Sequence, residues 1–206
     1  MKRELDYITI EGALGWDQHW FQDWSMYFGG CAAVTACDLC IYLAKEKGLS
    51  PLYPYDPNHV TKEDYLALAK IMKRYLTPRL QGIDTLPLYS SGLFGYWQKT
   101  GVTSLEIAEV SGALPWTEGR ALIKMQIDSA LPVPFLLLRH KNPSLKPYQW
   151  HWFNLAGYEE HEGDFSVKAV TYGSSRWLNL KELWESDHKR RGGFIRIVTP
   201  EAPLEK

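Results

Sequence analysis

The 206-residue chain is long enough to bury one hydrophobic core, and its 45% apolar and 23% charged residues are typical of a globular protein. Its formal net charge of −1 gives no general attraction to nucleic acid or to an anionic membrane surface. No apolar run approaches the roughly 20 residues that cross a bilayer, and the N-terminal segment has no apolar stretch of the signal-peptide type. We therefore expect a single cytoplasmic domain over residues 1–206, without a nucleic-acid or membrane partner.

The first half of the chain is predicted to be mainly helical, and residues 1–30 are expected to be irregular. Three helical patterns follow, each bounded by a capping residue, a glycine or a proline. The first covers 31–47, and the second runs from a Thr61 N-cap to about residue 76. The third covers 86–100, where glycines weaken the helical pattern, so that a short helix or a loop is expected.

The second half changes to strand patterns. Strands are predicted at 105–110, 133–139, 149–158, 165–172 and 193–198, with a helix that Thr117 caps and that runs to about residue 130, and one or two helical turns at 180–184. The connection 159–164 is short enough for a hairpin. Helices followed by an antiparallel sheet indicate an α+β fold, with approximate halves at 1–104 (mainly helical) and 105–206 (mainly β-sheet).

A cysteine opens the first predicted helix, directly after the pair Gly29-Gly30. Unpaired backbone N–H groups and the positive end of the helix dipole favour a thiolate at Cys31. Glycines also let a substrate carbonyl approach the backbone, because they lack a Cβ atom. The alternative is that Cys31 is a small apolar residue closing a tight turn.

The other two cysteines are predicted to be packing residues. On a helix, Cys37 lies at about 240° and Cys40 at about 180° from Cys31, so these two share a face with Ala33 and Ala36 while Cys31 points elsewhere. A Cys-x-x-Cys pair in mid-helix lacks the turn that metal and redox sites use, and a four-ligand zinc site would still lack two donors. We expect no metal, no cofactor and no disulfide framework.

His151 is the histidine whose position suggests a base, because it lies in an apolar, aromatic strand and shares a face with Phe153 and Leu155. Burial there disfavours the charged ring, a cost that a thiolate partner would offset. A hydrogen-bonded core histidine is the alternative. The order of a helix cysteine followed about 120 residues later by a strand histidine favours a nucleophile and its base.

Three blocks, at 17–20, 30–36 and 151–158, resemble the papain-like cysteine peptidases, and more narrowly the bacterial branch related to the peptidases that cleave double-glycine leaders from bacteriocins. The resemblance implies a papain-like fold with an N-terminal helical part, whose nucleophile helix packs on a C-terminal antiparallel β-sheet. It implies Cys31 as nucleophile and His151 as general base, then acid. Gln18, or its rival Gln22, would form the oxyanion hole with the Cys31 N–H.

The chain departs from the family pattern at two places. Ala32-Ala33 replaces the Gly-Pro that follows the nucleophile, and the Asp or Asn that orients the histidine is missing from the end of the next strand, where Thr171 stands. A threonine hydroxyl can fix the imidazole tautomer but stabilises imidazolium less than a carboxylate does. Asn154, Asn179 and Asp164 are weaker candidates for the same role, and the basic run 188–191 is predicted to be a solvated loop.

These features favour a thiol hydrolase that cleaves a peptide or other amide bond through a Cys31 acyl-enzyme. An acyltransferase would use the same residues with an amine as acceptor. The missing orienting carboxylate favours a third hypothesis, a binding or scaffold protein that has kept the fold without catalysis. A peptide or amide substrate is the expected partner, and the sequence predicts no oligomeric state.

Overall fold

The computed structural model describes residues 1–199 and has an α+β fold built on a seven-stranded antiparallel sheet, which confirms the expected class. The sheet order is β4-β9-β5-β6-β7-β8, and β1 pairs with β6 outside this path. Its strands are β1 (Lys2–Glu4), β4 (Glu106–Ser111), β5 (Val133–Leu137), β6 (His151–His161), β7 (Asp164–Thr171), β8 (Ser174–Asn179) and β9 (Gly192–Val198). Two short strands, β2 (Thr9–Ile10) and β3 (Ala13–Leu14), form a separate pair.

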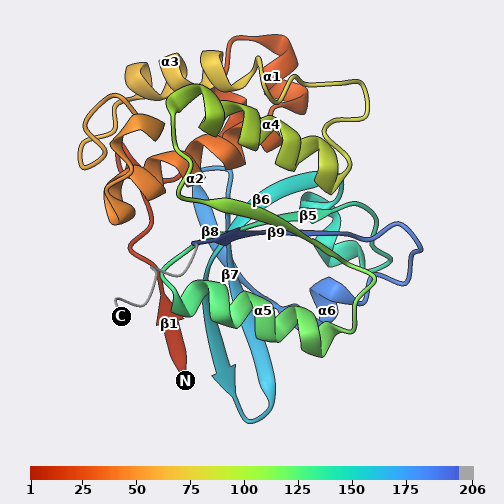
Figure 1. The fold of residues 1–206 in the computed structure, drawn as a ribbon. Coiled ribbons are helices and arrows are strands. Elements are labelled where there is room, and N and C mark those ends of the chain that lie inside the picture. The colour runs from red at the N-terminus through yellow and green to blue at the C-terminus, as the bar shows by residue number, and fades with distance from the viewer. Residues whose placement is uncertain (200–206) are drawn as a thin grey trace, which may run out of the picture.

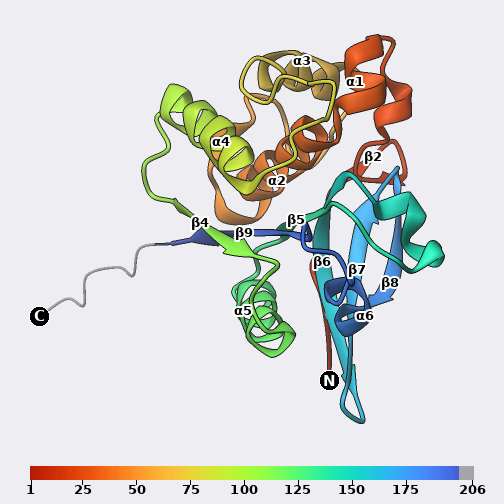
Figure 2. The ribbon, with the colours of Figure 1, turned by 90° about the vertical axis from the view of Figure 1, so that its right-hand side faces the viewer.

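Helices cover both faces of this sheet (Figures 1 and 2). One layer contains α1 (Trp24–Gly29), α2 (Cys31–Lys47), α3 (Lys62–Met72) and α4 (Leu86–Thr100). The opposite face carries α5 (Trp116–Asp128) and α6 (Leu180–Trp184). Short 3₁₀ helices are η1 (Gln18–Trp20), η2 (Ser50–Leu52) and η3 (Pro143–Tyr148). Among residues 1–199, no helix combines the length and apolar character needed to cross a membrane.

Helix α2 lies at the centre of the helical layer, and every residue from Cys31 to Ala44 is buried. It begins where predicted because Gly30 joins it directly to α1, and a Cβ at Gly30 would clash with the Met26 carbonyl. The Asn154 side-chain amide on β6 donates to the Thr35 carbonyl at 3.0 Å. This contact ties the N-terminal part of α2 to the strand that begins with His151.

The first thirty residues are not irregular, so that prediction was wrong. Asp23 caps α1 by accepting from the Ser25 N–H at 3.0 Å, and β1 forms because it pairs with β6, where Arg3 lies opposite Tyr158. A Cβ at Gly157 would lie 2.8 Å from the Arg3 carbonyl oxygen, so this glycine is needed for the close approach of β1. A local pattern cannot predict a strand whose partner is about 150 residues away.

Tertiary packing also decided three other elements. Residues 86–100 form a full helix. Its Gly92 is needed for packing, because a Cβ at this position would clash with Leu76. Helix α5 begins at Trp116 with Pro115 as its N-cap, so Thr117 is not the cap. Strand β8 was not predicted, and it forms as the sheet edge beside β7. The Thr61 cap is confirmed, because its hydroxyl accepts from the Asp64 N–H at 3.1 Å.

Candidate active site

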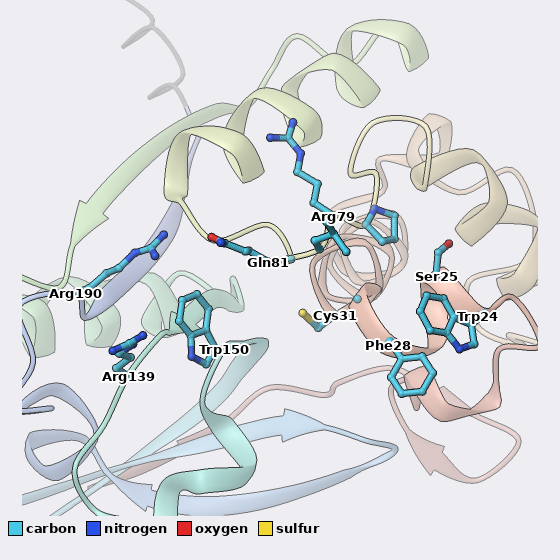
Figure 3. Close-up of a pocket in the computed structure, with 13 residues that line it drawn as sticks. Trp24, Ser25, Phe28, Cys31, Arg79, Gln81, Arg139, Trp150 and Arg190 are labelled. Atoms are coloured by element: carbon cyan, nitrogen blue, oxygen red, sulfur yellow. The ribbon is translucent and has the colours of Figure 1, made fainter.

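A cleft of about 710 Å³ opens at the N-terminal end of α2, and Cys31 lies in its wall (Figure 3). Three aromatic residues and three arginines are the largest side chains in its lining: Trp24, Phe28, Trp150, Arg79, Arg139 and Arg190. In the close-up the Cys31 sulfur lies between Trp150 on one side and Phe28 on the other. The cysteine that the sequence singled out therefore borders a cleft of a size that holds small ligands.

The Cys31 thiol is surrounded by backbone N–H groups, yet its pKa is raised. The amides of Trp152, Ala32 and Cys31 itself each lower the pKa of the thiol, but removal of the sulfur from water raises it by more. Burial therefore opposes the thiolate that the helix start was expected to favour at Cys31. Burial outweighs the helix terminus, and the resting side chain is a neutral thiol.

Cys37 and Cys40 lie in the core, as the helical phase predicted. Both are completely buried, and burial raises the pKa of the Cys40 thiol to about 12. Within residues 1–199 no group of three His, Cys, Asp or Glu side chains is arranged to hold a metal ion. Cys31 is thus the one of the three thiols that borders the cleft.

His151 and Thr171 are brought together by the pairing of β6 and β7. The His151 Nε2 atom lies 2.7 Å from the Thr171 hydroxyl oxygen. The ring is buried and stacks on Tyr172, with centroids 4.7 Å apart and planes 4° from parallel. Burial, with a smaller effect from the neighbouring His19, lowers the pKa of His151 to about 3. The imidazole is therefore neutral at physiological pH.

The other candidates for orienting His151 have different partners. Asn154 donates to Thr35 and to the Tyr7 hydroxyl. Asn179 caps α6, and Asp164 pairs with His161 at the far end of the β6–β7 hairpin. Of the residues weighed from the sequence, Thr171 alone contacts the imidazole among the hydrogen bonds of residues 1–199.

Cys31 and His151 lie on adjoining segments but do not bond to each other. The Trp152 N–H that acts on the thiol belongs to the peptide directly after His151. Within residues 1–199, the ring nitrogens of His151 lie next to the hydroxyls of Thr171 and Tyr172, the second at 3.5 Å from Nδ1, and neither nitrogen is hydrogen-bonded to the thiol. The pair is thus close in the fold, neutral and not hydrogen-bonded.

Gln18 and Gln22 occupy different environments. Gln18 is buried in η1, and its Nε2 donates to the Tyr27 carbonyl at 3.1 Å. Its Oε1 is buried without a hydrogen-bond partner among residues 1–199. Gln22 is exposed. Neither side chain lines the cleft, so the oxyanion role assigned to Gln18 is not visible in the resting geometry.

The sequence analysis missed the aromatic cover of His151 and the arginines of the cleft. Tyr172 stacks between His151 and His19, and the His19 ring centroid lies 5.1 Å from that of Tyr172. The basic run 188–191 is a largely exposed loop, as predicted, and its Arg190 also lines the cleft. Tyr172 could have been identified from the sequence, because it directly follows Thr171. No sequence pattern indicates that the distant arginines come together at one cleft.

Comparisons with protein-family models, with curated proteins and with solved structures found no match to this chain.

Proposed function

We propose that this chain is a papain-like thiol hydrolase that cleaves a peptide or other amide bond through an acyl-enzyme on Cys31. The observation that carries the proposal is the placement of the Cys31 thiol in a cleft, against the amide next to His151. The hydrogen bond of His151 to Thr171 supports it, because the imidazole of such a site needs an orienting partner. A nucleophile helix packed on an antiparallel sheet supports the papain-like assignment of the fold.

In the proposed reaction, the Cys31 sulfur attacks the amide carbonyl while its proton passes to Nδ1 of His151. The imidazolium then gives this proton to the departing amine as the C–N bond breaks, which leaves a thioester on Cys31. Water attacks the thioester with His151 as base, and the carboxylic acid and the thiol are released. The Cys31 backbone N–H stabilises the oxyanion, and the second N–H of the Gln18 amide is the candidate partner.

The resting site differs from a thiolate–imidazolium pair. Burial raises the pKa of Cys31 and lowers that of His151, so both neutral forms are favoured. In the proposed mechanism the proton therefore moves only when substrate is bound and the Tyr172 hydroxyl no longer approaches Nδ1. General-base assistance of this kind contributes about 10²- to 10⁴-fold to a rate.

The test uses p-nitrophenyl acetate, a small neutral acyl donor. Sulfur attack on its carbonyl releases nitrophenolate and leaves an acetyl thioester, which peptide mapping by mass spectrometry locates. We expect a nitrophenolate burst with the adduct on Cys31, no burst in Cys31→Ala, and a roughly 10²-fold slower burst in His151→Gln. Cys40→Ala is the matched control, since it removes a thiol from the same helix and should keep the burst. A burst that survives Cys31→Ala contradicts the proposal.

A binding protein without catalysis is the second candidate. It is favoured by a specific observation, namely that both ring nitrogens of His151 lie next to hydroxyls, while no hydrogen bond joins the ring to the thiol among residues 1–199. The same experiment separates the two functions. In a binding protein, any Cys31 thioester forms only at alkaline pH, at a rate that His151→Gln leaves unchanged, and water does not release it. In the hydrolase, acylation depends on His151 and water releases the thioester.

A further inference from the structure

We propose that the substrate of this cleft carries an anionic group, a carboxylate or a phosphate, which the arginines of the rim bind beside Cys31, while an apolar group of the substrate lies on α1. That the substrate contains an amide bond to be cleaved rests on the proposed function. The anion site itself is argued from the charges and contacts of the cleft, and it does not depend on catalysis.

The lining of the cleft is strongly one-sided in charge. Three of its residues carry a guanidinium group, and none of its lining residues carries a carboxylate. Arg190 forms an ion pair with Asp84, but Arg79 and Arg139 have no carboxylate partner among residues 1–199. Because arginine stays protonated at any working pH, the cleft has an excess of positive charge in a chain whose net charge is only −1.

Two of these arginines lie close to the same aromatic side chain, that of Trp150. The Cζ atoms of Arg139 and Arg190 lie 5.7 Å and 5.2 Å from the ring centroid of Trp150. Trp150 has a φ of 54°, a left-handed conformation that is uncommon for a tryptophan. Cations on a shared indole repel each other, and a bound anion would relieve this repulsion while accepting paired N–H bonds from a guanidinium fork.

The opposite side of the cleft is apolar. Trp24 and Phe28 extend from α1 with exposed fractions of 75% and 64%, which is large for side chains of this kind. In Figure 3 they lie across the Cys31 sulfur from Trp150 and Arg139. The thiol therefore lies between an apolar wall and a cationic wall, which fits an amide with an apolar group on one side and an anionic group on the other.

The first experiment compares two alkylating reagents of similar size, anionic iodoacetate and neutral iodoacetamide, at Cys31. Their rate ratio is measured by peptide mapping at pH 9.5 and divided by the same ratio for 2-mercaptoethanol, a thiol with no other charged group. An anion site should raise this normalised ratio at least ~3-fold at low ionic strength, and 1 M sodium chloride should remove the increase. Since the ratio cancels the thiol's intrinsic reactivity, it tests the cationic wall and not the nucleophile.

Arg139→Gln should lower the normalised ratio towards one. Arg74→Gln is the matched control, because Arg74 is an exposed arginine just after α3 that does not line the cleft. A wild-type ratio equal to that of 2-mercaptoethanol overturns the inference. So does a ratio that Arg139→Gln leaves unchanged.

A second measurement does not need the thiol at all and decides the outcome if Cys31 reacts with neither reagent. The thermal unfolding of Cys31→Ala protein is followed with succinate, with inorganic pyrophosphate, and with sodium chloride at matched ionic strength. Stabilisation by succinate indicates a site for carboxylates, and stabilisation by pyrophosphate indicates a site for phosphates. Either stabilising effect should be lost in the double variant Cys31→Ala/Arg139→Gln. No stabilisation beyond that of sodium chloride overturns the inference. Failure of the proposed function would instead appear as a missing Cys31 thioester.

Discussion

The Nε2 atom of His151 and the hydroxyl oxygen of Thr171 lie 2.7 Å apart across the neighbouring strands β6 and β7. A hydroxyl can donate or accept a hydrogen bond, so it can hold the ring in place without supplying charge. This contact leaves Nδ1 as the nitrogen on which the proposed chemistry depends. It also explains why burial, with no carboxylate to oppose it, lowers the pKa of His151.

Replacing Thr171 by valine removes the hydroxyl and keeps the shape of the side chain. We expect the acylation rate of Cys31 to fall ~10-fold, because the ring is no longer held in one orientation. Thr171→Asp should raise the pKa of His151 by placing a carboxylate beside Nε2. Rates across pH and NMR titration of the imidazole measure both effects. A valine variant with wild-type rates would show that Thr171 does not position the ring.

The reaction of Cys31 with iodoacetamide should follow the raised pKa of its thiol. We expect the rate to rise only at alkaline pH, with a midpoint above that of glutathione, and to show no plateau below pH 7. Peptide mapping separates Cys31 from the buried Cys37 and Cys40. Rapid alkylation below pH 7 would instead mean that Cys31 and His151 form an ion pair that the resting geometry does not contain.

Tyr172 covers the His151 ring and keeps it dry. In Tyr172→Ala we expect the pKa of His151 to rise from about 3 towards its ordinary value, because water reaches the imidazole. Tyr172→Phe keeps the ring stack and removes only the hydroxyl that lies 3.5 Å from Nδ1, so it should leave this pKa low. NMR titration of the ring protons measures both variants, with His151→Gln to assign the signal. Equal titration of the two variants would contradict the shielding role of the aromatic ring.

Asp38 should make stability depend on pH. Its carboxyl group, buried in α2, accepts from the Tyr65 hydroxyl at 2.7 Å and the Tyr7 hydroxyl at 3.3 Å, and burial raises its pKa to about 7. The unfolded chain titrates this group near pH 4. Because the folded state holds the proton more tightly, its stabilising contribution is complete below pH 4 and is lost as the pH rises to about 7.

Asp38→Asn removes this titration, so the unfolding free energy of wild type relative to the variant should fall between pH 4 and 7, by at most ~1.4 kcal/mol per pH unit. Urea unfolding at several pH values measures it. Asp23→Asn is the control, since Lys73 and other partners lower the pKa of Asp23 to about 2 and it does not titrate in this window. Parallel curves for wild type and Asp38→Asn would show that Asp38 is not protonated in the folded chain.

Local pattern was sufficient for the elements that carry the proposed site. Helix α2 runs over the predicted residues because Gly30 and Gly48 bound it, and period-two alternation located β6 and β7 within a few residues. The resemblance also implied that Thr171 would stand at the position that orients His151, and the β6–β7 pairing brings the two together. Strand β1 and helix α1 were missed, because their packing partners lie elsewhere in the chain or their pattern is too short.

The sequence by itself determined the α+β class and the order of Cys31, His151 and Thr171 along the chain. Helix ends and strand alternation can be predicted because they depend on residues that are close together in the sequence. Only the tertiary structure decided the protonation of these groups, since a pKa depends on how much water surrounds a side chain and not on its position in a helix. Tertiary structure also brought Arg79, Arg139 and Arg190 from three separate loops to one cleft. No local pattern encodes that convergence, because it arises from the packing of the helical layer on the sheet.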